Sequence, residues 1–206
     1  MLRETQAHST RREIVAAATR LFTERGYGVT SVDDIAREAG VSRATVFAAF
    51  GDKARLLKAA YDVALVGDDE PRALRDRAIA KAVLSEREPE RVLERFARMC
   101  VDIGSRLPPM YEAVRGAASA DPEARPIWDK IRQERSLGAR HLVELLKPAA
   151  LRAGVTKAIA SDIVFAMTEP GLYQLLVNER GWSPERFEAF LAATLKAQLL
   201  DPRRKI

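Results

Sequence analysis

The stretch from Ser31 to Phe50 constrains the fold of this chain most, because it has the pattern of two short helices joined by a tight turn. Apolar residues recur at helical spacing in each half, and Gly40 falls between them, where a sharp turn favours a residue that adopts positive φ. Ser42 is expected to cap the second helix, because its hydroxyl can accept a bond from a free backbone N–H. The pattern therefore predicts a helix–turn–helix, whose second helix typically enters the DNA major groove.

Helical patterns flank this stretch on both sides. Upstream, Ser9 to Gly26 predicts a longer amphipathic helix, and Thr30 or Ser31 is expected to cap the helix that follows. Downstream, Asp52 is expected to cap a further helix that carries Leu56 and Leu57. Three helices would then form a small core, and a fourth would lead away from it.

The whole array consists of the upstream helix, the segment GYGVTSVDDIAREAGVS, the short second helix and the segment FGDKARLL. Over about Ser9 to Leu57 this array resembles the tetracycline-repressor (TetR) family of bacterial transcription factors. The resemblance implies a homodimer. Each subunit would have a three-helix DNA-binding head at residues 8–55 and a helical body at residues 56–206 for ligand binding and dimerisation. It also implies DNA contacts by a set of residues in the head: Ser31, Ser42, Arg43, Ala44, Thr45, Phe47, Ala48 and Lys53.

Two positions depart from the pattern of that family. Phe47 stands where the family usually has Tyr, and Ala49 where it often has His, so two phosphate donors are missing. Arg43 and Thr45 remain as polar side chains on the second helix, and an Arg can bind guanine O6 and N7 together. Lys53 would hold a phosphate and fix register without reading sequence. The alternative for Arg43 and Lys53 is a solvated helix end.

Composition favours an all-α protein that can bind nucleic acid. The chain has 206 residues, a formal net charge of +5 and 6% aromatic residues. It has no long run of alternating β-branched residues, which argues against strands. A basic balance permits a nucleic-acid partner without requiring one, and the head alone is only mildly basic. We therefore expect affinity for DNA to depend on the placement of a few cations.

Cys100 is the single cysteine, so no intrachain disulfide can form. This suits a reducing compartment, and together with the lack of an apolar leader or a long apolar span it predicts a cytoplasmic protein with no membrane partner. Cys100 lies in an apolar stripe, where a free thiol behaves as a small hydrophobe. A redox-sensing role for this thiol stays open at this point.

The second half of the chain predicts further helices and an interface. Pro71 is expected at the first position of a helix that runs to about Leu84, and a long helix is expected from Asp121 to about Leu151, shortened or kinked by Pro148. Ser183 is expected to cap the last helix. The final helices carry more apolar surface than one core needs, and the resemblance implies that residues 156–200 form the homodimer interface.

A break in the helical pattern at residues 168–171 has two interpretations. It is either a tolerated kink or the border of a ligand cavity. We expect the body to bind a small, largely apolar molecule that changes the fit of the head to DNA. The candidate wall residues, each of which could equally be plain core, are Met99, Ile103, Tyr111, Trp128, Phe165 and Tyr173.

No catalytic constellation is found in the sequence. The zinc-binding HExxH, the phosphate-cradling P-loop and the GxSxG elbow are all missing, and the two histidines lie far apart. We therefore expect no enzyme activity, no cofactor and no metal. The predicted function is that of a ligand-responsive homodimeric repressor that binds a pseudopalindromic operator. The alternative is a helical dimer that works through protein partners and binds DNA weakly.

Overall fold

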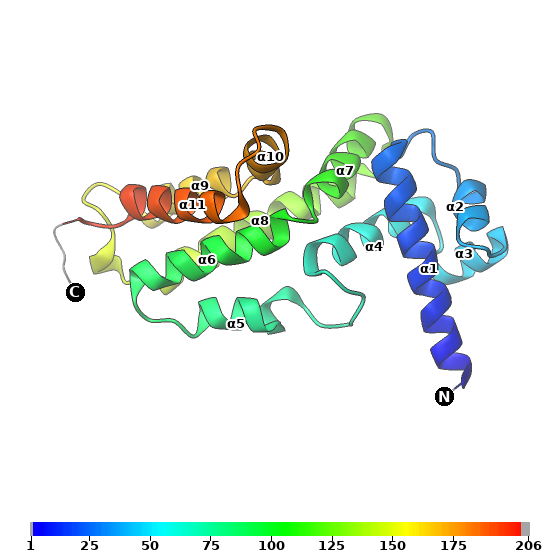
Figure 1. Ribbon diagram of the computed structural model, residues 1–206, viewed down its shortest axis with the longest axis horizontal. Helices are drawn as coiled ribbons and strands as arrows, with labels where there is room; N and C mark the ends of the chain where they lie inside the picture. The colour runs from blue at the N-terminus through cyan, green and yellow to red at the C-terminus, as the bar shows by residue number, and fades with distance from the viewer. Residues whose placement is uncertain (1, 203–206) are drawn as a thin grey trace. The chain divides into compact units, whose positions relative to one another are not determined.

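The computed structural model describes residues 2–202, and every regular element in this range is a helix (Figure 1). This confirms the predicted all-α fold. The helices pack into two compact units: one combines the chain up to Glu70 with Pro109–Lys130, and the other combines Pro71–Pro108 with the chain from Ile131 onward. The predicted domain boundary between residues 55 and 56 lies inside the helix Lys53–Val66. The functional division into a DNA-binding head and a ligand-binding body stays a prediction.

The first unit contains the predicted helix–turn–helix. α1 (Leu2–Glu24) packs against α2 (Val32–Glu38) and α4 (Lys53–Val66), and α3 (Arg43–Phe50) contacts both α2 and α4. The fully buried side chains of this core come from α1, α2 and α4 and include Ile14, Phe22, Ile35, Leu56 and Leu57. The predicted start of α1 at Ser9 is wrong, because the polar residues before it also adopt helix without an apolar stripe to reveal it.

Local hydrogen bonds fix both ends of the turn between α2 and α3. The Ser31 hydroxyl accepts from the Asp34 N–H at 3.1 Å, while the Asp34 carboxylate accepts from the Ser31 N–H at 3.0 Å, which is a complete capping box. The Ser42 hydroxyl accepts from the Thr45 N–H at 3.0 Å. Gly40 has φ +67°, as the turn requires. The predicted cap at Ser42 is confirmed, and of the two candidates for α2, Ser31 is the cap.

The same unit includes α7 (Pro108–Ala120) and the first residues of α8 (Arg125–Leu145). The rings of Tyr111 on α7 and Trp128 on α8 lie 5.0 Å apart between centroids. The helix α8 begins later than the predicted Asp121 and ends earlier than the predicted Leu151. Pro148 starts a short 3₁₀ turn beyond its end, so the predicted shortening by this proline is confirmed.

The second unit is built around α6. α6 (Pro89–Gly104) packs against α5 (Ala78–Leu84), α10 (Pro170–Tyr173) and α11 (Pro184–Leu199), and α11 also packs against α9 (Lys157–Met167). A π-helical stretch, Gln174–Glu179, connects α10 to the turn before α11. The Ser183 hydroxyl accepts from the Arg186 N–H at 3.2 Å, which confirms the predicted cap of the last helix.

The predicted helix from Pro71 is wrong. A single 3₁₀ turn forms at Leu74–Asp76, and α5 begins only at Ala78. Pro71 and the acidic residues before it resemble a helix start in composition, yet apolar spacing is sparse until residue 78, so little buried contact holds an earlier turn.

The predicted break at residues 168–171 separates α9 from α10. Pro170 occupies the first position of α10, where its missing N–H costs nothing. The Thr168 hydroxyl donates to the Val164 carbonyl at 2.8 Å, and Arg135 Nη2 donates to the Phe165 carbonyl at 3.1 Å. A side chain from α8 thus serves one of the carbonyls at the end of α9, a partner that the local sequence does not reveal.

Candidate nucleic-acid interface

One face of α3 is open and the other is buried. Val46 and Phe50 point into the head, at 3% and 7% exposure, while Phe47 on the other face is 39% exposed. Thr45 is half-buried. The exposed residues at the start and along the open face are Ser42, Arg43, Ala44, Phe47 and Ala48. The structure therefore brings together all the predicted residues of this helix on or beside one accessible surface.

Arg43, the predicted base reader, has two neighbours that hold its guanidinium. Its Nη1 lies 2.6 Å from Asp33 Oδ2 on α2, and its Cζ lies 5.2 Å from the centroid of the Phe47 ring. Asp33 lies in the first turn of α2. An acidic side chain is expected there because it interacts favourably with the helix dipole, with no need of a further partner. Its pairing with Arg43 was therefore missed by sequence reasoning.

The two serine hydroxyls and the Thr45 hydroxyl already have partners within the chain. Thr45 Oγ1 lies 2.8 Å from Ser42 Oγ, so the Thr45 methyl is its remaining free group. Hydrogen bonds from Ser31 hold the pKa of the Asp34 carboxyl below its ordinary value, so the carboxylate of the capping box stays charged further into the acidic range. These contacts fix the first turns of α2 and α3. The free backbone N–H groups of these turns are the ones that would approach a DNA phosphate.

Lys53, the predicted phosphate contact, is half-buried at the start of α4. Its Nζ lies 3.9 Å from the centroid of the Tyr27 ring, a cation–π distance. Burial lowers the pKa of Lys53, and the nearby Asp121 carboxylate opposes that shift. Burial also raises the pKa of Tyr27, as does its hydrogen bond to Asp121. The phosphate role of Lys53 stays a prediction, and the structure gives this cation partners inside the head.

Arg11 on α1 reaches the end of α3. Its Nη1 donates to the Ala49 carbonyl at 2.8 Å, and its Cζ lies 4.1 Å from the centroid of the Phe50 ring. A cation at a helix C-terminus is favourable for the helix dipole. The contact spans 38 residues of sequence, and no local pattern could have revealed it.

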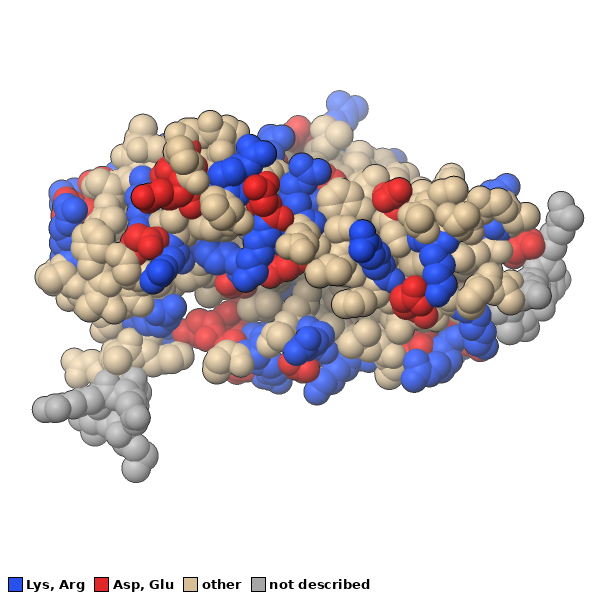
Figure 2. All heavy atoms as spheres, turned by 180° about the vertical axis from the view of Figure 1, so that it is seen from behind, with Lys and Arg blue, Asp and Glu red and all other residues tan. Residues whose placement is uncertain are grey.

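Charges of both signs are interspersed on the face of the molecule drawn in Figure 2. Figure 2 shows Lys and Arg side chains among Asp and Glu on the face drawn there, without a single broad basic patch. This view agrees with the expectation that affinity for DNA depends on a few individual cations, and that expectation stays a prediction.

Comparison with known proteins identifies the head. Residues 14–60 match the family model described as bacterial regulatory proteins, tetR family. This segment therefore has the sequence of the DNA-binding part of the TetR family. Over 47 residues it is 49% identical to the HTH-type transcriptional regulator HbdR of Aromatoleum sp. (strain CIB), across 23% of this chain and 20% of that protein. Over 64 residues it is 42% identical to the HTH-type transcriptional regulator TtgR of Pseudomonas putida, across 30% of each protein.

The sequence likeness thus spans less than a third of these two curated relatives, whereas the structural likeness is wider. The crystal structure of NalD from Pseudomonas aeruginosa, described as the secondary repressor of the MexAB-OprM multidrug efflux pump, matches with a TM-score of 0.70 at 22% identity. The match covers 95% of this chain and 99% of that one. At this identity the match supports the TetR fold beyond residue 60 and nothing finer.

The six candidate ligand residues fall in both compact units. The rings of Tyr111 and Trp128 contact each other at a tilted angle in the first unit. In the second unit Tyr173 belongs to the buried core, Met99 and Phe165 pack against that core, and Ile103 is half-buried on α6. Their role as a ligand wall stays a prediction.

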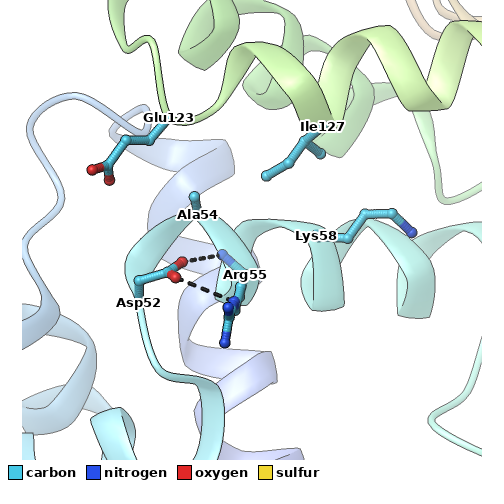
Figure 3. A pocket seen from close by; sticks show the side chains of 6 residues that line it. All are labelled: Asp52, Ala54, Arg55, Lys58, Glu123 and Ile127. Carbon is cyan, nitrogen blue, oxygen red and sulfur yellow. Dashed lines mark hydrogen bonds and ion pairs between the residues drawn. The ribbon is translucent and has the colours of Figure 1, made fainter.

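A hollow of about 470 Å³ with both charged and apolar lining residues lies in the first unit beside the start of α4 (Figure 3). It is lined by Asp52, Ala54, Arg55, Lys58, Glu123 and Ile127, and by none of the six candidate ligand residues. Its charges are largely paired within the chain. Asp52 accepts from the Arg55 N–H at 2.7 Å, which confirms the predicted cap of α4, and Lys58 pairs with Asp62 at 2.5 Å.

Cys100 packs against the core of the second unit, as the apolar stripe predicted. Burial raises the pKa of its thiol from 9.0 to about 12, so little thiolate exists at neutral pH. Redox-sensing thiols have the opposite character, a low pKa with an exposed sulfur. Across residues 2–202, no helix is both long and apolar enough to span a bilayer.

Proposed function

We propose that this protein is a TetR-family, sequence-specific, DNA-binding transcriptional regulator that acts as a repressor. The observation that carries the proposal is the capped, outward-facing α3 within the segment that matches the TetR family model. α3 would enter the major groove, with Arg43 bound to a guanine and the Ala48 and Thr45 methyl groups against a thymine methyl. Ser31, Ser42, Ala44, Phe47 and Lys53 would lie against the backbone or groove walls.

The proposal includes a homodimer formed through residues 156–200. Two large apolar side chains in this region are exposed: Ile159 on α9 at 45% and Leu175 in the π-helical stretch at 47%. A twofold interface would cover them with the same surface of a second copy. The dimer would place two copies of α3 on the half-sites of a pseudopalindrome, and regulation of a chromosome implies a cytoplasmic protein.

The proposal also includes a small, largely apolar ligand of the body. Such a ligand would release DNA only if it bound the released state more tightly than the DNA-bound state. Titration of the protein–operator complex with hydrophobic compounds tests this part. A fall in operator affinity would support it, and unchanged affinity across a chemically diverse set would contradict it.

Selection of bound sequences from random duplex DNA tests the DNA-binding function. The purified protein is used at physiological salt, because non-specific affinity falls steeply as salt rises. Enrichment of an inverted repeat is the expected result. If a folded dimer enriches no sequence, the proposed function is contradicted, and the alternative of a dimer that acts through protein partners is favoured.

A further inference from the structure

We propose that Asp33 is a positioning residue that sets the base preference of this protein by holding Arg43. The inference rests on the proposed function, because it concerns how the recognition helix reads a base. It starts from an observation that the helix–turn–helix pattern does not contain: the carboxylate on α2 lies 2.6 Å from the guanidinium at the start of α3.

The guanidinium of Arg43 is held by two partners and keeps donors for a third. Asp33 Oδ2 engages Nη1, and the Phe47 ring lies 5.2 Å from Cζ. Among the described residues no other hydrogen bond to Arg43 is present, so its remaining N–H groups are available for a base edge. Guanine offers O6 and N7 as a pair of acceptors that a fixed guanidinium fork matches.

Holding the side chain matters because a free arginine samples many rotamers. Ordering such a side chain on binding costs conformational entropy, and an orientation fixed beforehand removes part of that cost. Both members of the pair are more than half exposed, at 58% and 52%, so the pair adds little to the stability of the fold. Its effect is therefore expected mainly on where the guanidinium lies relative to DNA.

Phe47 contributes to the same arrangement. It stands at the position where the family usually has Tyr, so it lacks the hydroxyl that could reach a phosphate. Its ring, 39% exposed, remains as a face beside the Arg43 guanidinium. The departure at Phe47 removes a backbone contact but retains a surface that restricts the base-reading side chain.

The test compares Asp33→Asn with a matched control, Glu38→Gln. Glu38 lies on the same helix, is also exposed and also pairs with an arginine, since its Oε1 lies 2.6 Å from Arg20 Nη2. Each variant removes one negative charge from α2 and frees one arginine, so a general electrostatic gain in affinity is common to both. Asp33→Glu keeps the carboxylate and serves as the rescue variant.

The readout is the preference for guanine at the base pair where Arg43→Ala loses discrimination. We expect Asp33→Asn to reduce that preference about twofold to fivefold, the range of an exposed ion pair, while Glu38→Gln leaves it unchanged. Asp33→Glu should restore most of it. In an Arg43→Ala background, Asp33→Asn should change nothing further at that base pair.

Two results would overturn the inference. Equal guanine preference in Asp33→Asn and Glu38→Gln would remove the positioning role. A sharper preference in Asp33→Asn would mean that Asp33 withholds Arg43 from DNA instead of presenting it. Both results presuppose that the wild-type protein enriches a sequence. If it does not, the proposed function fails before the role of Asp33 is reached.

Discussion

The packing of the Tyr173 ring against Gly104 in the second unit gives a sharp prediction. A Cβ added at this last residue of α6 would lie 2.5 Å from Cδ2 and 2.7 Å from Cγ of Tyr173. Carbon atoms pack best at about 3.5–4.0 Å, so the methyl group would overlap the ring by about 1 Å. The ring has little freedom to yield, because Tyr173 is 5% exposed and stacks edge-on against Phe187 at 5.0 Å.

The expected cost follows from two opposing effects. Extra methyl groups in a well-packed core cost about 1–3 kcal/mol. Alanine is favoured over glycine by up to about 1 kcal/mol inside a helix, and by less at its last residue. Gly104→Ala should therefore lower the free energy of unfolding by about 1–2 kcal/mol, which corresponds to a fall in Tm of about 2–8 °C for a chain of this size.

Gly138→Ala is the matched control. It lies within α8 in the same unit, and a Cβ there meets no atom within 4 Å, so it should stabilise by about 0.5–1 kcal/mol. Thermal and urea unfolding, followed by circular dichroism, measure both variants. If Gly104→Ala unfolds at or above the wild-type midpoint, the ring of Tyr173 is not packed on Gly104, and the described contact between α6 and α10 is wrong.

Three further predictions concern the thiol, the head and the last helix. Because burial raises the pKa of Cys100 from 9.0 to about 12, the thiolate fraction at pH 8 falls roughly thousandfold. Alkylation of the native protein should be slower by a similar factor than in urea, and equal rates would contradict the burial. Asp121→Asn should lower the free energy of unfolding by about 1–2 kcal/mol in urea titrations, because the carboxylate serves Tyr27 and Lys53; an unchanged midpoint would argue against this cluster. Ser183→Ala should cost about 0.5–2 kcal/mol by the same assay while Ser183→Asp costs little, and equal losses would show that capping is not the cause.

Local chemistry made the recognition segment predictable. The caps at Ser42, Asp52 and Ser183 were found because a hydroxyl or carboxylate bonds an N–H within three residues, and such a bond needs no knowledge of the fold. Gly40 was found for a similar reason, since its positive φ is a property of one residue. The family resemblance then indicates which residues of α3 would contact DNA.

Contacts between elements were not predictable from the same patterns. Asp33 and Arg43 are 10 residues apart, and Arg11 and Ala49 are 38 apart, so each pair exists only because α1, α2 and α3 pack at particular angles. Lys53 illustrates the consequence. The family resemblance implies a phosphate contact for Lys53, which stays a prediction, whereas its contact with the Tyr27 ring arises from packing and has no local signal. The predicted helix start at Pro71 was wrong because apolar residues are sparse before Ala78, where α5 begins.

The central claim is that α3 reads DNA sequence through Arg43, and one comparison of affinities tests it most directly. The affinity for the selected operator and for random duplex DNA is measured at physiological salt for the wild type, Arg43→Ala and the control Arg20→Ala. Arg20 is likewise an exposed, ion-paired arginine of the head. We predict that Arg43→Ala weakens operator binding by about 1–3 kcal/mol and binding to random DNA no more than the control does. Equal losses for both variants on both DNAs would contradict the claim.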